Sequence, residues 1–89
     1  MMTREETKKA LVVLLTDSLR YDGETDEDGR EKLTSTVPGP ILNFMLNELF
    51  DESDMDEESF TRLLNESLDE AGDKLLTEYK AEHPSEIQQ

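Results

Sequence analysis

The last third of the sequence carries the pattern that most constrains the fold, because it predicts one long helix. Between residues 57 and 83 the apolar side chains recur at steps of three and four, which places them on one face of a helix. The pattern continues in phase through Gly72, and His83-Pro84 ends it, so we expect one helix of about 27 residues. Gly72 costs about 1 kcal/mol relative to Ala, which predicts a close approach by another helix or a gentle kink. The predicted apolar face consists of Phe60, Leu63, Leu64, Leu68, Ala71, Leu75, Leu76 and Tyr79.

Two shorter helices are predicted before it. Thr3-x-x-Glu6 forms a capping box, which predicts a first helix running to about Arg20. Residues 10–15 are all aliphatic, so this helix is apolar on nearly every side, as is typical of a central helix covered by neighbours. A second helix is predicted from Pro40, a first-turn residue, to Phe50. Asp54-x-x-Glu57 resembles a capping box for the third.

The connections contain the breaking residues. Residues 21–28 read as a hydrophilic connection, residues 27–33 as a short helical turn, and residues 34–40 as an interruption that contains Pro38 and Pro40. These elements predict an all-α fold, a small antiparallel bundle of three or four helices with a long C-terminal helix. We expect one helical domain over residues 1–84 and a flexible C-terminal tail over 85–89.

The charge balance limits which partners the chain can bind. Twenty-three acidic residues oppose nine basic ones, for a formal net charge of −14. Such a surface repels nucleic acid and anionic membranes, so we expect no direct binding to either. The longest aliphatic run is six residues, too short to cross a bilayer, and the N-terminus lacks the layout of a secretory signal. These features predict a cytoplasmic protein whose counterpart is a basic protein.

No residue pattern supports catalysis, a cofactor or a metal. Cysteine is absent and the only histidine, His83, lies at a predicted helix end, where a catalytic group would be poorly held. Glu24-x-Asp26-x-Asp28 echoes the start of a calcium loop, but Ser35 stands where the bidentate Glu is required. We therefore predict a protein that is not an enzyme and has no cofactor and no metal site.

Three acidic segments are the candidate binding residues. Residues 22–28 contain five acids, residues 51–58 contain six, and residues 66–73 contain four. Carboxylates four residues apart on a helix lie about 6 Å apart along its axis, similar to neighbouring phosphates on a nucleic-acid strand. The predicted partner-binding residues are Asp22, Glu24, Asp26, Glu27, Asp28, Asp51, Glu52, Asp54, Asp56, Glu57, Glu58, Glu66, Asp69, Glu70 and Asp73.

These observations favour an inhibitor that mimics nucleic-acid charge and blocks a basic nucleic-acid-binding protein or nuclease, provided that the segments converge on one surface. In composition alone the chain resembles the loose class of DNA-mimic and host-takeover inhibitors of phages and mobile elements, and small acidic immunity proteins. The alternative is a helical adaptor or homodimerising module that docks through an exposed apolar strip of Phe44, Phe50, Phe60 and Tyr79, with charge that only confers solubility.

Overall fold

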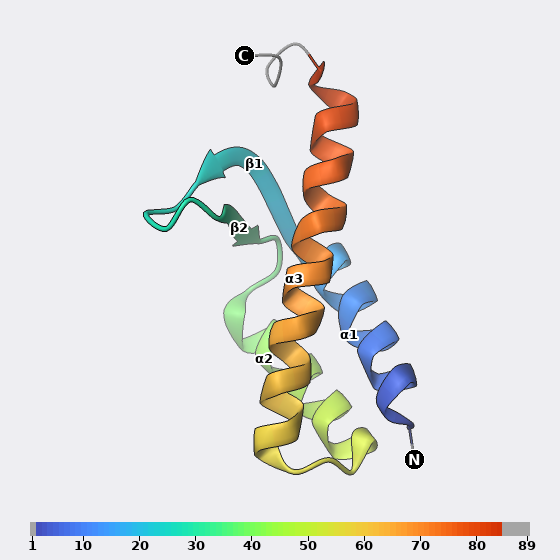
Figure 1. The fold of residues 1–89 in the computed structure, drawn as a ribbon. Helices are drawn as coiled ribbons and strands as arrows, with labels where there is room; N and C mark the ends of the chain where they lie inside the picture. The colour runs from blue at the N-terminus through green and yellow to red at the C-terminus, as the bar shows by residue number, and fades with distance from the viewer. Residues whose placement is uncertain (1, 85–89) are drawn as a thin grey trace.

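The fold combines three helices with one β-hairpin (Figure 1). The computed structural model describes residues 2–84, so the predicted tail over 85–89 lies outside the described residues. The elements are α1 (Arg4–Ser18), β1 (Leu19–Thr25), β2 (Glu31–Ser35), α2 (Gly39–Ser53) and α3 (Glu57–Glu82). α1 and α3 run in the same direction and α2 runs in the opposite one, while the hairpin lies beside the C-terminal half of α3 (Figure 1). The prediction of an all-α bundle of three or four helices is therefore wrong.

The first helix begins as predicted and ends earlier. The capping box is formed, with the Glu6 N–H donating to Thr3 Oγ1 at 3.1 Å and the Thr3 N–H donating to Glu6 Oε1 at 2.9 Å. α1 stops at Ser18 because Leu19 adopts extended backbone angles. The Ser18 carbonyl then accepts hydrogen bonds from the N–H and the hydroxyl of Thr36, at 2.7 and 3.1 Å.

The segment predicted as a connection and a helical turn forms an antiparallel hairpin instead. Tyr21 pairs with Leu33 in the β1–β2 register, and the register shifts between Tyr21 and Thr25. A β-turn closes the hairpin, because the Gly29 N–H donates to the Asp26 carbonyl at 3.0 Å. Gly29 has φ +81°, a left-handed conformation that glycine adopts without steric cost.

The long helix is continuous, as predicted, but its surroundings differ from the prediction. Asp56, and not Asp54, caps α3, because its Oδ1 accepts from the Ser59 N–H at 2.9 Å. Asp54 instead ends α2 in a left-handed conformation with φ 56°. Gly72 is buried against Leu33 of the hairpin, so a strand, and not another helix, makes the close approach.

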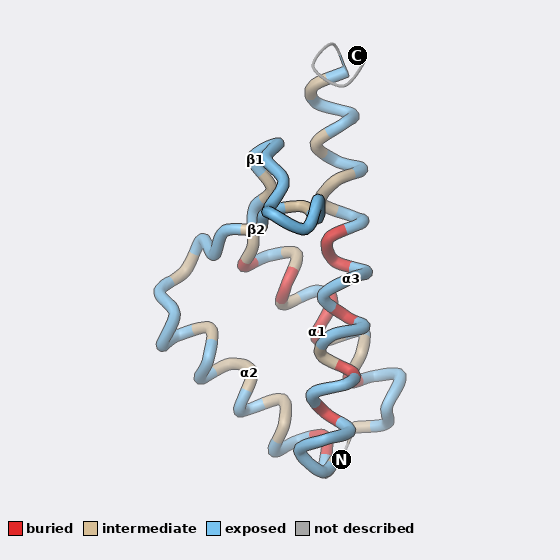
Figure 2. The backbone as a smooth tube through the Cα atoms, turned by 60° about the vertical axis from the view of Figure 1, so that its left-hand side comes forward, coloured by how far each residue is buried: buried red, intermediate tan, exposed pale blue. Residues whose placement is uncertain are grey.

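The hydrophobic core is thin and lies between α1 and α3, where most of the buried residues are found (Figure 2). Leu11, Phe60 and Leu63 form its centre, and the rings of Phe50 and Phe60 meet edge to face with centroids 5.1 Å apart. Ser67 is also buried, and its hydroxyl donates to the Leu63 carbonyl, so its burial leaves no polar group unpaired. α2 contributes mainly half-buried side chains near its C-terminal end, which leaves much of its apolar surface uncovered.

Candidate functional site

Two of the three acidic segments meet at a cleft between the hairpin and α3. Asp26 and Glu31 line the cleft from the hairpin, and Asp69 and Asp73 line it from α3. Arg30 is the only basic residue among the lining residues, and its Nη2 lies 4.0 Å from Asp69 Oδ1. The cleft therefore carries four carboxylates and one guanidinium.

The turn of the hairpin holds Asp26 in place. One carboxylate oxygen of Asp26, Oδ1, accepts the N–H groups of Asp28 and Arg30 at 2.9 and 3.0 Å. This Asx-type arrangement is a common way for an aspartate to fix a tight turn. It leaves the second carboxylate oxygen of Asp26 without a partner among residues 2–84, so the turn still presents negative charge.

Helical periodicity places the α3 carboxylates. Asp69 and Asp73 are one turn apart and both are exposed. Like charges at this spacing destabilise an isolated helix by a few tenths of a kcal/mol, roughly, so helix stability does not account for the pair. Glu70 lies on the adjacent exposed surface and makes no ion pair within the described residues.

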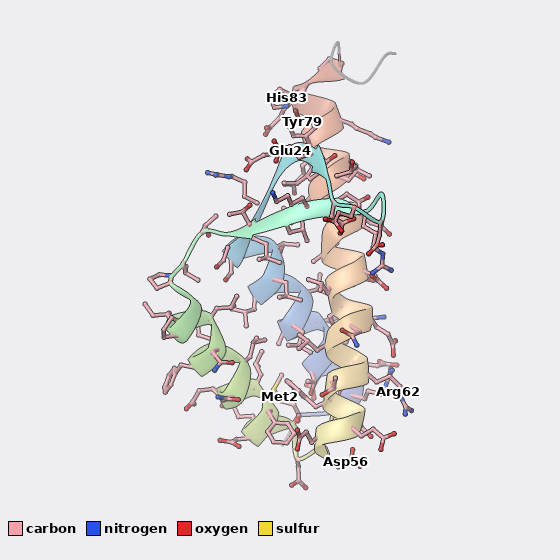
Figure 3. The ribbon with its side chains drawn as sticks, turned by 90° about the vertical axis from the view of Figure 1, so that its left-hand side faces the viewer. Met2, Glu24, Asp56, Arg62, Tyr79 and His83 are labelled. Atoms are coloured by element: carbon pink, nitrogen blue, oxygen red, sulfur yellow. The ribbon has the colours of Figure 1, made fainter. Side chains whose placement is uncertain are left out.

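The third acidic segment, residues 51–58, lies away from the cleft. It forms the end of α2, the turn and the start of α3, where the Glu52 carbonyl accepts the Met2 N–H at 3.2 Å. Asp56 lies at one end of the molecule and Glu24 lies toward the other (Figure 3). The longest dimension is 46 Å, so the three segments do not form one continuous surface.

Basic side chains separate the two acidic regions along α3. Arg62 Nη2 lies 3.0 Å from Glu58 Oε1. Glu66 forms two ion pairs with α1, since its Oε2 lies 3.0 Å from Arg4 Nη2 and its Oε1 lies 3.9 Å from Lys8 Nζ. These pairs are largely exposed, and exposed pairs contribute about 0–1 kcal/mol each. Glu66 is thus a bridge between α1 and α3, and not an open member of the acidic surface.

Within the hairpin, bases also neutralise two of the predicted residues. Asp22 Oδ1 lies 2.9 Å from Arg20 Nε, and Glu24 Oε2 lies 4.0 Å from Lys32 Nζ. The predicted residues without an ion pair in the described part of the chain, near the hairpin and the middle of α3, are Asp26, Glu27, Asp28, Glu70 and Asp73. These five, with Asp69 and the cleft residue Glu31, define what we call the hairpin–α3 acidic face.

Two carboxylates with clearly shifted pKa values lie outside this face and act as helix caps. Hydrogen bonds from the side chain and N–H of Ser59 lower the pKa of Asp56 below its ordinary value. Hydrogen bonds from the backbone and side chain of Thr3 lower the pKa of Glu6 in the same way. Their role is structural, because each satisfies amide groups at the start of a helix.

The remaining candidate groups are placed in structural contacts. His83 follows the last residue of α3. Its ring stacks on the ring of Tyr79 with centroids 4.2 Å apart, and its Nδ1 lies 3.2 Å from the Tyr79 carbonyl oxygen. Glu24, Asp26 and Asp28, which resemble the start of a calcium-binding loop in the sequence, belong to β1 and the hairpin turn. Among residues 2–84 no three carboxylate or imidazole groups converge in the manner of metal ligands.

The proposed aromatic strip of the alternative hypothesis does not exist as one surface. Phe50 and Phe60 pack on each other, and the rings of Tyr21 and Tyr79 meet edge to face with centroids 5.0 Å apart. Phe44 alone of the four is largely exposed, at 63%.

Sequence reasoning missed Arg30 and Glu31 as members of the cleft, because it did not predict the hairpin. Asp28-Gly29 is a typical hairpin-turn dipeptide, and it was the signal that could have found them.

Comparison of the chain with protein-family models, with curated proteins and with solved structures finds no match. None of the helices in residues 2–84 combines the length and apolar composition needed to cross a membrane.

Proposed function

We propose that this chain is a non-catalytic acidic binding protein that occupies a basic, nucleic-acid-binding surface of another protein through the hairpin–α3 acidic face. The observation that carries the proposal is the cleft where Asp26, Glu31, Asp69 and Asp73 surround a single base, Arg30. The carboxylates come from two elements distant in sequence. Their gathering is therefore a property of the fold and not of one acidic run.

The chemistry of the face favours a protein rather than a nucleic acid as its partner. Phosphates would be repelled by the carboxylates, whereas lysine and arginine side chains would be attracted and steered toward them. Asp69 and Asp73 are about 6 Å apart along the helix axis, a spacing close to that of neighbouring phosphates. A groove that binds a nucleic-acid strand would accept this row as a substitute. A cytoplasmic location is part of the same proposal.

The face is smaller than the sequence alone indicated. Residues 51–58 lie at the other end of the molecule, so we assign them no part in this contact. Glu66 is also left out because Arg4 and Lys8 engage its carboxylate. The proposal therefore concerns the two regions that the fold brings together, residues 26–31 and 69–73.

The test compares two variants of equal charge. The first neutralises the cleft with Asp26→Asn, Glu31→Gln, Asp69→Asn and Asp73→Asn. The control neutralises the distant end with Asp51→Asn, Glu52→Gln, Asp54→Asn and Glu57→Gln. Each removes four acids, so each net charge moves from −14 to −10.

The immobilised chain is used to capture basic proteins from the native host, with elution by a salt gradient, and each captured protein is then tested for nucleic-acid binding. We expect binding to weaken steeply with salt, as for a contact made by charge. The cleft variant should lose the partner and the distant variant should retain it. Equal loss in both would show that only net charge matters, and that result would refute the proposed face.

A further inference from the structure

Part of the apolar surface of α1, at Val13, is not covered by the rest of the chain. Residues 10–15 are an unbroken aliphatic run, and a helix that is apolar all round is normally enclosed by neighbours. α3 covers one side of α1, where Leu11 and Leu15 are buried. Val13 on the outer side is 58% exposed. One copy of the fold therefore leaves part of this helix facing water.

A shallow apolar groove runs beside Val13, between α1 and α2. Val13 and Leu14 line it from α1, and Met45 and Leu49 line it from α2. The side chains of Leu14, Met45 and Leu49 are only half-buried. The groove is therefore an incomplete helix–helix interface, with apolar walls on both sides and no third element above it in residues 2–84.

α2 extends the same apolar surface beyond the groove. Ile41, one turn before Met45, is 50% exposed, and Phe44 is 63% exposed. Residues 33–47 contain no charged side chain, although charged residues make up 36% of the chain. A surface kept free of charge in so acidic a chain is suited to contact with another apolar surface.

Two charges of opposite sign mark the ends of the groove. Lys9 and Asp17 both line it, each four residues from Val13, so the three residues form one stripe along α1. Neither Lys9 nor Asp17 makes an ion pair within the described residues. They are two helical turns apart, about 12 Å along the axis, too far to pair with each other in one copy.

We propose that this face binds a second copy of the same chain around a two-fold axis that passes near Val13. A two-fold axis at the centre of the stripe reverses its direction in the second copy, so Lys9 of each copy would meet Asp17 of the other. The stripe has a positive end, an apolar centre and a negative end, so its charges match those of a second copy that runs in the opposite direction. α1 and α2 of the two copies would then form a four-helix arrangement that encloses the exposed side of α1.

The second copy is favoured over other occupants by this symmetry of charge. Asp17 is the only acid among the residues that line the groove, whereas the hairpin–α3 acidic face offers several to a basic partner. The proposed dimer contact is on α1 and α2 and leaves that acidic face open. It therefore does not depend on the function proposed above.

Sedimentation equilibrium of the full chain tests the proposal. The wild-type protein should show twice the chain mass of 10.2 kDa as its concentration rises. Val13→Glu places two carboxylates near the axis and should leave a monomer at every concentration, with unchanged helix content by circular dichroism. A wild-type chain that stays monomeric up to a concentration of about 1 mM would overturn the proposal. A Val13→Glu dimer would also overturn it.

A charge swap tests the two-fold register and does not require any core change. Lys9→Glu and Asp17→Lys should each weaken the dimer about tenfold, because each replaces two attractions with two repulsions. The double variant restores both opposite-charge contacts, so its dissociation constant should return to within about threefold of the wild-type value. Lys74→Glu and Glu78→Lys on α3 make the same charge changes and should leave the dimer unchanged. Failure of the double variant to recover would overturn the Lys9–Asp17 pairing, and so would equal weakening by the α3 controls.

Discussion

The side chain of Tyr79 lies directly against the backbone of Gly23. A Cβ at position 23 would overlap the Tyr79 hydroxyl and the ring carbon that carries it. Gly23 also has φ +90° and lies in the part of β1 where the register with β2 shifts. Together with the Tyr21 ring, which meets Tyr79 edge to face, this contact attaches the hairpin to the C-terminal half of α3.

Gly23→Ala should therefore release the hairpin from α3. A non-glycine residue in a left-handed conformation costs about 1–2 kcal/mol. At position 23 the displacement of Tyr79 adds to that cost. We expect faster amide hydrogen exchange in β1 and a changed near-ultraviolet circular dichroism signal from the two tyrosines, while the signal of the helices is retained.

Gly29→Ala provides the matched control for this prediction. Gly29 also has a positive φ, +81°, but nothing lies within 4 Å of the position that its Cβ would take. We expect a cost of about 1–2 kcal/mol from the backbone alone. If both variants affected exchange in β1 equally, the contact between Tyr79 and Gly23 would have no role in holding the hairpin.

Phe60 and Phe44 are expected to differ sharply in their contribution to stability. Phe60 is 7% exposed and packs on Phe50, so Phe60→Ala should cost about 3–5 kcal/mol, enough to unfold much of so small a domain. Phe44 is 63% exposed, so Phe44→Ala should change the free energy of unfolding of the monomer by less than about 0.5 kcal/mol. Urea titrations below the concentration at which the chain self-associates measure both values, and a large loss in Phe44→Ala would contradict this assignment of the core.

The helices could be predicted from the sequence because their signals are local. The Thr3–Glu6 capping box and the apolar face of α3 depend on spacings of three and four residues, and both are present in the structure. The hairpin could not be recognised from apolar alternation, because most of β1 is exposed and only Leu19 and Tyr21 are half-buried. The hairpin packs on Tyr79, far along the chain, and single-sequence patterns do not reveal such contacts.

The candidate site was predictable only in part for the same reason. The sequence identifies the acidic segments, but the hairpin decides which of them meet. The turn at Asp26 and the contact with α3 bring residues 26–31 to Asp69 and Asp73, while the α2–α3 turn carries residues 51–58 to the far end. Arg4 and Lys8 reach Glu66 only because α1 packs beside α3, and no spacing along the chain predicts that pair.

Gly72→Ala should stabilise the protein. The nearest atom to a Cβ at this position is Leu33 Cδ1 at 3.9 Å, an ordinary van der Waals distance, so alanine fits without displacing the hairpin. Alanine is favoured over glycine inside a helix by about 1 kcal/mol, and we expect a gain approaching that value in urea unfolding. Ala71→Leu is the contrasting variant, because Ala71 is fully buried and a larger side chain should cost about 1–3 kcal/mol. A loss of stability in Gly72→Ala would mean that Leu33 cannot accommodate the methyl group.

Acidification should remove the contribution of Asp56 to stability. The hydrogen bonds from the Ser59 side chain and N–H lower the pKa of the folded carboxyl below its ordinary value of 3.8. A group whose pKa is lower in the folded state stabilises the fold fully above the unfolded value, and this contribution is lost as the pH falls through the folded value. Protonation of the exposed acids that cap no helix acts in the opposite direction, because it relieves the repulsion within a chain of net charge −14.

The difference between the wild-type protein and Asp56→Ala separates the two effects, because the general relief of repulsion acts on both proteins. At pH 6 the variant should be the less stable of the two, since the Ser59 N–H at the start of α3 loses its acceptor. Urea unfolding at a series of lower pH values should show this gap closing below pH 3.8, the ordinary value for an aspartate. Glu78→Ala removes the same charge from a position that caps no helix, and its smaller gap should follow only the general repulsion. A gap for Asp56→Ala that stayed constant or widened on acidification would show that the carboxylate form of Asp56 does not hold the start of α3.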